Sequence, residues 1–145
     1  MKLYTDVHSL GGLASLGELL DRGHWRERIE IAVMHRKLIR VRKGWYALAG
    51  EAEAVIRAWR VGGRLACRSA VAFHTGIGIG TGEGTLLHVE VPANTARLRS
   101  PNDAKQRLGR DDGVVVHWVG DRGEGDRRAA PLERALEQAQ RCRAP

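Results

Sequence analysis

The first clear signal in the sequence is a short apolar stretch bracketed by helix start and stop residues. Ser15 and Glu18 have the S-x-x-E spacing of a capping box, in which each side chain accepts a hydrogen bond from the backbone N–H of the other residue. Gly23 follows where a left-handed residue is needed to end a helix. The pattern predicts a helix of about two turns over residues 16–22.

A second helix is predicted directly after this turn, over residues 25–36. Its apolar positions recur at helical spacing and should face the core: Trp25, Ile29, Ala32 and Val33. The positions between them should face solvent: Arg26, Glu27, Glu30 and Ile31. Two short helices joined by a tight glycine turn indicate a helix-turn-helix, and a weaker helix over residues 4–10 would be its third member.

The next segment, residues 38–48, reads LIRVRKGWYAL and alternates apolar with basic residues, as a half-buried β-hairpin does. Lys43-Gly44 suits a two-residue turn. With that turn the expected register is Arg42 opposite Trp45, Val41 opposite Tyr46, Arg40 opposite Ala47 and Ile39 opposite Leu48. One face would then be apolar, and the other would place guanidinium groups beside the Trp45 indole in a cation-π contact.

Three helices followed by a basic hairpin are typical of a winged helix-turn-helix. In that fold a helix can enter the major groove of DNA, while the hairpin lies along phosphates or in the neighbouring minor groove. The residues that we expect to contact DNA are His24, Arg26, Glu27, Arg36, Lys37, Arg40, Arg42, Lys43 and Trp45. Among them, Glu27 could accept a hydrogen bond from cytosine N4.

Each of these residues also has a simpler interpretation. The basic residues of the hairpin could lie on a solvated strand face, and Arg26 and Glu27 on an exposed helix face with ordinary salt bridges. His24 could be a plain turn residue. Arg36 and Lys37 could complement the negative end of the helix dipole.

Beyond residue 50 the pattern predicts a small α/β domain. Helices are expected over 51–60, 69–74 and 131–142, and strands over 86–91 and 114–119, the last with the continuous apolar run of a buried strand. The alternating glycines of HTGIGIGTGEG match no phosphate-binding motif, so this stretch and residues 121–128 are expected to be mobile loops. The predicted class is α+β, with a winged helix-turn-helix over 1–50 and a small α/β domain over 51–145.

The distribution of charge indicates which class of molecule the chain binds. The 145 residues carry 24 Lys and Arg against 17 Asp and Glu, a formal net charge of +7. Five basic and no acidic residues fall within residues 36–43. A basic surface of this kind attracts polyanions and releases their counterions on binding, which favours double-stranded DNA as the partner.

Composition and motifs argue against several other classes. No stretch approaches the roughly 18 to 20 apolar residues of a membrane span, and the N-terminus lacks the pattern of a signal peptide. Two cysteines without CxxC spacing indicate reduced thiols in the cytoplasm. The six histidines form no HExxH or comparable motif, and His117 is expected to be a packed strand residue. We therefore predict no enzymatic activity, no cofactor and no metal site.

The order of motifs resembles the AbiEi-type antitoxins of type IV toxin-antitoxin systems. The resemblance rests on GGLASLGELLDRG (11–23), LIRVRKGWYAL (38–48), GRLACRSAVAFHTG (63–76), LHVEVP (87–92) and VVVHWV (114–119). It implies an N-terminal winged helix that binds operator DNA and represses its own operon, followed by a region with antitoxin activity. Longer relatives continue into a further domain that is often nuclease-like.

The sequence therefore leads to two hypotheses. The first is a sequence-specific regulator of transcription that binds duplex DNA, most simply a repressor. The alternative is a protein-binding antitoxin or adaptor, whose C-terminal domain neutralises a toxin or another protein partner. The pattern leaves the oligomeric state open between a monomer and a homodimer, of which the homodimer would bind a palindromic site.

Overall fold

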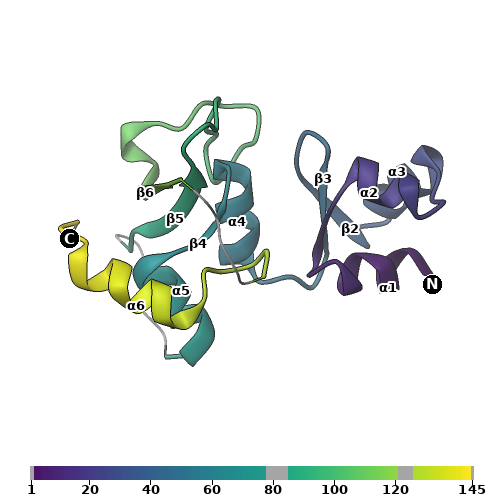
Figure 1. The fold of residues 1–145 in the computed structure, drawn as a ribbon. Coiled ribbons are helices and arrows are strands. Elements are labelled where there is room, and N and C mark those ends of the chain that lie inside the picture. Colours follow the sequence, from purple (N-terminus) through teal and green to yellow (C-terminus); the bar gives the residue numbers. More distant parts are fainter. Residues whose placement is uncertain (1, 78–84, 121–125, 145) are drawn as a thin grey trace.

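A computed structural model describes residues 2–77, 85–120 and 126–144 of the chain. These residues form a mixed α+β structure with six α-helices and two three-stranded sheets. Figure 1 shows the first sheet with the N-terminal helices on one side of the molecule and the second sheet with α4, α5 and α6 on the other. Residues 78–84 and 121–125, which make up most of the two predicted loops, lie outside the described residues.

The first fifty residues contain three helices and a small antiparallel sheet. In chain order the elements are α1 (Lys2–Ser9), β1 (Leu13–Ser15), α2 (Leu16–Asp21), α3 (Arg26–Met34), β2 (Leu38–Arg42) and β3 (Trp45–Leu48). The strand order is β1-β3-β2, so β3 is the central strand. The three predicted helices and the hairpin are confirmed, and β1 is an additional strand that sequence reasoning did not predict.

Local signals place α2 and α3 as expected, with one exception. The capping box of α2 is present: the Glu18 N–H donates to Ser15 Oγ at 3.1 Å, and the Ser15 N–H donates to a Glu18 carboxylate oxygen at 2.9 Å. On α3, Ile29 and Ala32 are buried as predicted. The prediction for Trp25 was wrong, because this residue is the extended N-cap before α3 and its side chain is 76% exposed.

The hairpin has the predicted turn but a different register beyond it. Arg42 pairs with Trp45 as expected, whereas Arg40 pairs with Tyr46. The register shifts between Arg40 and Arg42, so Val41 is an extra residue in a β-bulge. A strictly alternating pattern cannot reveal such an insertion, and this is why the predicted pairs past the first were wrong.

The central strand β3 is covered on both faces. Tyr46 packs in a core cluster formed with the N-terminal helices, which also contains Leu3 and Ile29. Ala47, expected on the outer face, is fully buried in a second cluster with Val55 and Trp59 of α4 (Glu53–Val61). Helix α4 therefore covers much of the hairpin face that we expected to be free for DNA.

The remaining elements build the second sheet and its helices. They are β4 (Arg64–Leu65), α5 (Cys67–Thr75), β5 (Leu87–Pro92), the 3-10 helix η1 (Arg110–Asp112), β6 (Val114–Val119) and α6 (Leu132–Arg141). The strand order is β4-β5-β6, in which β5 runs antiparallel to β4 and parallel to β6. The predicted helices and strands are confirmed, except that β6 is a half-exposed edge strand rather than a buried one, with Trp118 54% exposed.

A buried ion pair lies within this second sheet. Arg64 and Glu90 are register partners on β4 and β5, both side chains are fully buried, and Arg64 Nε donates to Glu90 Oε2 at 2.7 Å. The other carboxylate oxygen accepts from Gln138 Nε2 at 2.9 Å and lies 3.2 Å from Arg134 Nε. The Glu90 carboxylate thus has further partners from α6, and Arg64 Nη1 donates to the Asp126 carbonyl at 2.9 Å, as burial of the two charges requires.

Two arginines connect the C-terminal residues to the N-terminal elements. Arg127 forms a two-pronged pair with Glu18, at 2.7 and 2.5 Å, and also donates to the Leu13 carbonyl at 3.0 Å. Arg128 donates to a Glu51 carboxylate oxygen at 2.9 Å. The apolar cluster around α4 also spans both parts of the chain, with Leu13 on one side and Val89 on the other. The domain boundary expected at residue 50 stays a prediction.

The Arg127–Glu18 pair makes stability depend on pH in the acid range. The guanidinium of Arg127 lowers the pKa of Glu18 from 4.5 to about 2. A lowered folded-state pKa stabilises the fold above pH 4.5, and this contribution is lost as the pH falls towards 2. We expect urea denaturation to show a loss of about 2 kcal/mol over that interval, reduced from the full shift because both side chains are partly solvated. In Glu18→Gln this part of the acid loss should be absent; an unchanged pH profile would contradict the assignment.

Candidate nucleic-acid interface and a cluster of cysteine and histidine residues

The end of α3 places two cations on the surface. Arg36 adopts a left-handed backbone conformation (φ +58°), and the N–H groups of Arg36 and Lys37 donate to the Val33 and Ala32 carbonyls at 3.0 and 2.9 Å. These bonds close the last turn of the helix and fix the start of β2. Both side chains are exposed, as predicted.

Further cations lie on the neighbouring elements. Arg26 begins α3, Arg40 lies on β2, and Lys43 is at the tip of the hairpin; all three side chains are exposed. Residues 26–43 contain seven basic and two acidic side chains, so this stretch has an excess of positive charge. Exposed Arg and Lys side chains of this kind are suited to contact phosphates.

Arg42 and Trp45 lie elsewhere than expected. Arg42 is half-buried, its guanidinium donates to the Arg97 carbonyl at a long 3.5 Å, and burial lowers its pKa. The Trp45 ring packs on Trp59 of α4, with the ring centres 4.4 Å apart. The guanidinium carbon of Arg127 lies 5.5 Å from the Trp45 ring centre, so the structure gives this indole a cation-π contact with Arg127. The structure therefore places Arg42 and Trp45 against the C-terminal part of the chain.

His24 is also internal. Its side chain is 3% exposed, and its Nε2 lies 2.6 Å from an Asp6 carboxylate oxygen. This hydrogen bond holds the pKa of the Asp6 carboxyl below its usual value, and Arg22 adds a second contact at 3.2 Å. His24 therefore ties the turn between α2 and α3 to α1, and the expected phosphate contact is not supported.

The outer face of α3 is mixed in character. Glu27 is exposed beside Arg26, as predicted, and it adds a negative charge to the helix. Three large apolar side chains near it are also exposed: Trp25 by 76%, Ile31 by 54% and Met34 by 78%. Single exposed apolar residues are common, but three on one short helix and its N-cap suit contact with another macromolecule.

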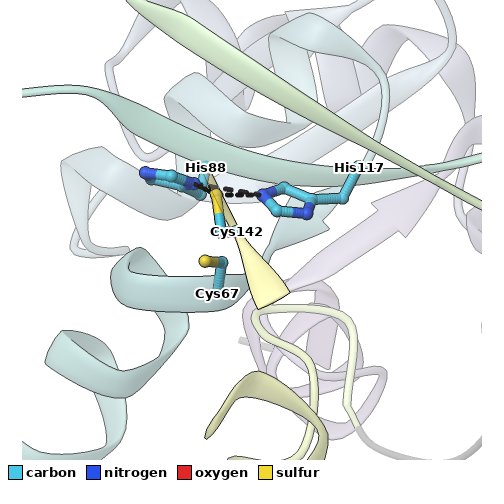
Figure 2. A group of neighbouring side chains, drawn as sticks. All are labelled: Cys67, His88, His117 and Cys142. Carbon is cyan, nitrogen blue, oxygen red and sulfur yellow. Dashed lines mark hydrogen bonds between the residues drawn. The ribbon is translucent and has the colours of Figure 1, made fainter. Parts of the chain in front are cut away.

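A second group of functional side chains lies at the far end of the molecule. Cys67, His88, His117 and Cys142 converge so that one donor atom from each lies within 4.8 Å of all the others. His88 Nδ1 is 3.0 Å from His117 Nε2, and Cys142 Sγ is 3.9 and 4.0 Å from these two nitrogens. Figure 2 shows the two imidazoles on neighbouring strands pointing toward each other, with both sulfur atoms beside them.

Burial favours the neutral form of both imidazoles in this cluster. Burial lowers the pKa of His88 to about 4, and it lowers the pKa of His117 as well. Burial also raises the pKa of the Cys67 thiol. A neutral imidazole has one ring nitrogen with a free lone pair, which is the form that accepts a hydrogen bond or ligates a metal ion.

Sequence reasoning missed this group. The four residues are separated by 21, 29 and 25 positions, so no short motif marks them. His117 was expected to be an ordinary packed strand residue, and no metal site was predicted. Cys142 and the two histidines fall on elements predicted for the C-terminal part, whereas Cys67 precedes the helix predicted over 69–74.

The sequence has no match among protein-family models or among curated proteins. The resemblance described above therefore stays a prediction. None of the helices that the structure describes is long and apolar enough to cross a membrane.

Proposed function

We propose that the chain is a regulator of transcription that binds double-stranded DNA through an N-terminal winged helix-turn-helix. The element order α1-β1-α2-α3-β2-β3, in which three helices precede a hairpin, and the β1-β3-β2 sheet support this proposal. In this proposal α3 is the helix presented to the major groove and the β2–β3 hairpin is the wing. The resemblance to AbiEi-type antitoxins supports a repressor of its own operon.

The observation that carries the proposal is the exposure of the cations on these consecutive elements. A basic side chain can contact a DNA phosphate only if it is exposed to solvent in the free protein. The exposed basic residues are Arg26, Arg28, Arg36, Lys37, Arg40 and Lys43. This revised contact set omits Arg42, Trp45 and His24, whose side chains are used inside the fold.

The two hairpin arginines offer a matched test. We expect Arg40→Ala to weaken binding of the chain to a fragment carrying its own promoter by about fivefold to tenfold, and to reduce the salt dependence by about one counterion. Arg42→Ala removes the same charge from the half-buried face and should bind within about twofold of the parent. Electrophoretic mobility shifts at several salt concentrations measure both, with thermal melting to confirm that each variant folds. Equal weakening by both changes, or by neither, would contradict the assigned surface.

The exposed apolar side chains of α3 and its N-cap favour a second candidate, a protein-binding adaptor that contacts its partner through α3 rather than through the C-terminal domain that we expected from the sequence. Trp25, Ile31 and Met34 could form the centre of a protein interface, where aromatic residues and methionine are enriched. This candidate predicts a stable complex with the product of a neighbouring gene, and that complex should survive Arg40→Ala. Loss of the complex with Met34→Glu, at unchanged DNA affinity, would favour it over the first proposal.

A further inference from the structure

We propose that Cys67, His88, His117 and Cys142 bind one zinc ion that holds the C-terminal helix onto the second sheet. Two thiolates and two imidazoles are a ligand set that zinc prefers, and four protein ligands are the number that structural zinc sites use. The proposal concerns the C-terminal part of the chain and is independent of DNA binding.

The geometry of the cluster is close to that of a loaded site. Zinc–sulfur and zinc–nitrogen bonds of about 2.3 and 2.0 Å place tetrahedral donor atoms about 3.3 to 3.8 Å apart. The nitrogen–nitrogen distance is 3.0 Å, the two sulfur–nitrogen distances of Cys142 are 3.9 and 4.0 Å, and all four donors lie within 4.8 Å. Side-chain shifts of less than about 1 Å would therefore make the donors equidistant from one ion.

The surrounding residues hold the ligands in place. The Cys67 N–H donates to Gln138 Oε1 at 2.9 Å, and the same Gln138 amide donates to the buried carboxylate of Glu90. The His88 N–H donates to Ser69 Oγ at 2.9 Å. These backbone hydrogen bonds fix the main chain at two of the four ligands.

The backbone of Cys67 gives an independent indication. Its φ is +53°, a left-handed conformation that costs a non-glycine residue of order 1 kcal/mol or more. Glycine would adopt this conformation without strain, so a cysteine here indicates that the side chain is needed. From the first turn of α5, the Cys67 sulfur lies within 4.8 Å of a ring nitrogen of each histidine.

The four ligands come from four different elements: α5, β5, β6 and the residue that follows α6. One ion would therefore cross-link the last helix to the sheet and to α5. A surface hollow of about 410 Å³, lined in part by His117, Gln138 and Cys142, gives the ion a route from solvent. Binding would release one proton from each thiol, because cysteine ligates zinc as the thiolate.

A disulfide between the two cysteines is the competing chemistry. Their sulfur atoms are within 4.8 Å, and a disulfide would require them to approach to about 2.05 Å, together with an oxidant that accepts two electrons. A disulfide would not account for two imidazoles that point at the same place. We therefore favour the metal, and the disulfide becomes an outcome of the test.

The test measures metal content and ligand identity in the full-length protein. Protein purified under reducing conditions, with zinc supplied and then dialysed away, should contain about one zinc per chain by elemental analysis. After zinc removal, titration with Co²⁺ should give the visible absorption bands of tetrahedral cobalt with thiolate ligands. Zinc below about one tenth per chain in the folded protein, or a Cys67–Cys142 disulfide found by mass spectrometry under the same conditions, would overturn the proposal.

Variants identify the ligands. Cys142→Ser and His117→Asn should each lower zinc affinity at least 100-fold and lose the cobalt spectrum, whereas His35→Asn, at the exposed end of α3, should keep both. His117 and Cys142 are half-buried, so we expect the fold to tolerate these two changes best. Circular dichroism checks that each variant is folded. Where a variant does not fold, metal protection of the parent cysteines from alkylation gives the same answer: unprotected thiols at saturating zinc would overturn the proposal.

Discussion

Replacing Glu90 by alanine should lower the free energy of unfolding by about 3 to 5 kcal/mol, the largest effect that we expect from any single substitution. The change leaves the Arg64 guanidinium buried without the carboxylate that it donates to at 2.7 Å. It also removes the acceptor of Gln138 Nε2. Urea denaturation followed by circular dichroism measures this loss as a shift of the transition midpoint.

Two further variants test whether the loss of stability comes from the ion pair or from any substitution of a carboxylate in this part of the chain. Glu133→Ala removes an exposed carboxylate from the first turn of α6 and should change stability by less than about 0.5 kcal/mol. The double variant Arg64→Met, Glu90→Leu removes both charges together and should recover most of the loss. If Glu90→Ala is as stable as Glu133→Ala, the buried pair does not have the role described here.

Removing four exposed cations around the proposed wing should weaken DNA binding by about a thousandfold near physiological salt. The variant combines Arg36→Ala, Lys37→Ala, Arg40→Ala and Lys43→Ala, all of them surface positions. If each contacts one phosphate, the slope of log affinity against log salt concentration should become shallower by about 3.6. Fluorescence anisotropy with a labelled promoter duplex, repeated over a range of salt, measures both quantities.

The chain offers a control with the same change in net charge. The exposed cations of the C-terminal part include Lys105, Arg107, Arg110 and Arg141. Replacing these four by alanine lowers the net charge equally but removes no side chain of the proposed interface. We expect affinity within about threefold of the parent, and only a small change of slope. Equal losses in the two variants would show that net charge alone, and not the wing, attracts DNA.

Features that depend on residues close together in the sequence could be predicted. The capping box of Ser15 and Glu18 defines the start of α2 within a few residues, and Lys43-Gly44 defines the hairpin turn. The α-helices and the main strands of the C-terminal part follow from the spacing of their apolar residues. In each case the information lies within one element or one turn.

Features that depend on contacts distant in sequence could not be predicted. Alternation of residues in the hairpin shows two faces, but it does not show that α4 covers one of them and that Trp45 packs on Trp59. In the same way, nothing near His24 in the sequence indicates its partner Asp6, 18 residues away.

The cysteine and histidine cluster is the extreme case of this limitation. Its ligands are spread over 76 residues of the chain, from Cys67 to Cys142, and they meet only because β5 and β6 are parallel neighbours and α6 returns beside α5. Motif searches rely on short spacings, such as two cysteines separated by two residues. A zinc site formed by tertiary structure leaves no such signature.

The proposal that this chain binds duplex DNA through α3 and the hairpin is tested most directly by selecting genomic fragments with the purified protein and footprinting the fragments recovered. We expect enrichment of a fragment that contains the promoter of its own operon, with a short protected segment on the duplex and no enrichment by the variant lacking the four wing cations. Recovery of random fragments only, or equal enrichment by that variant, would contradict the account.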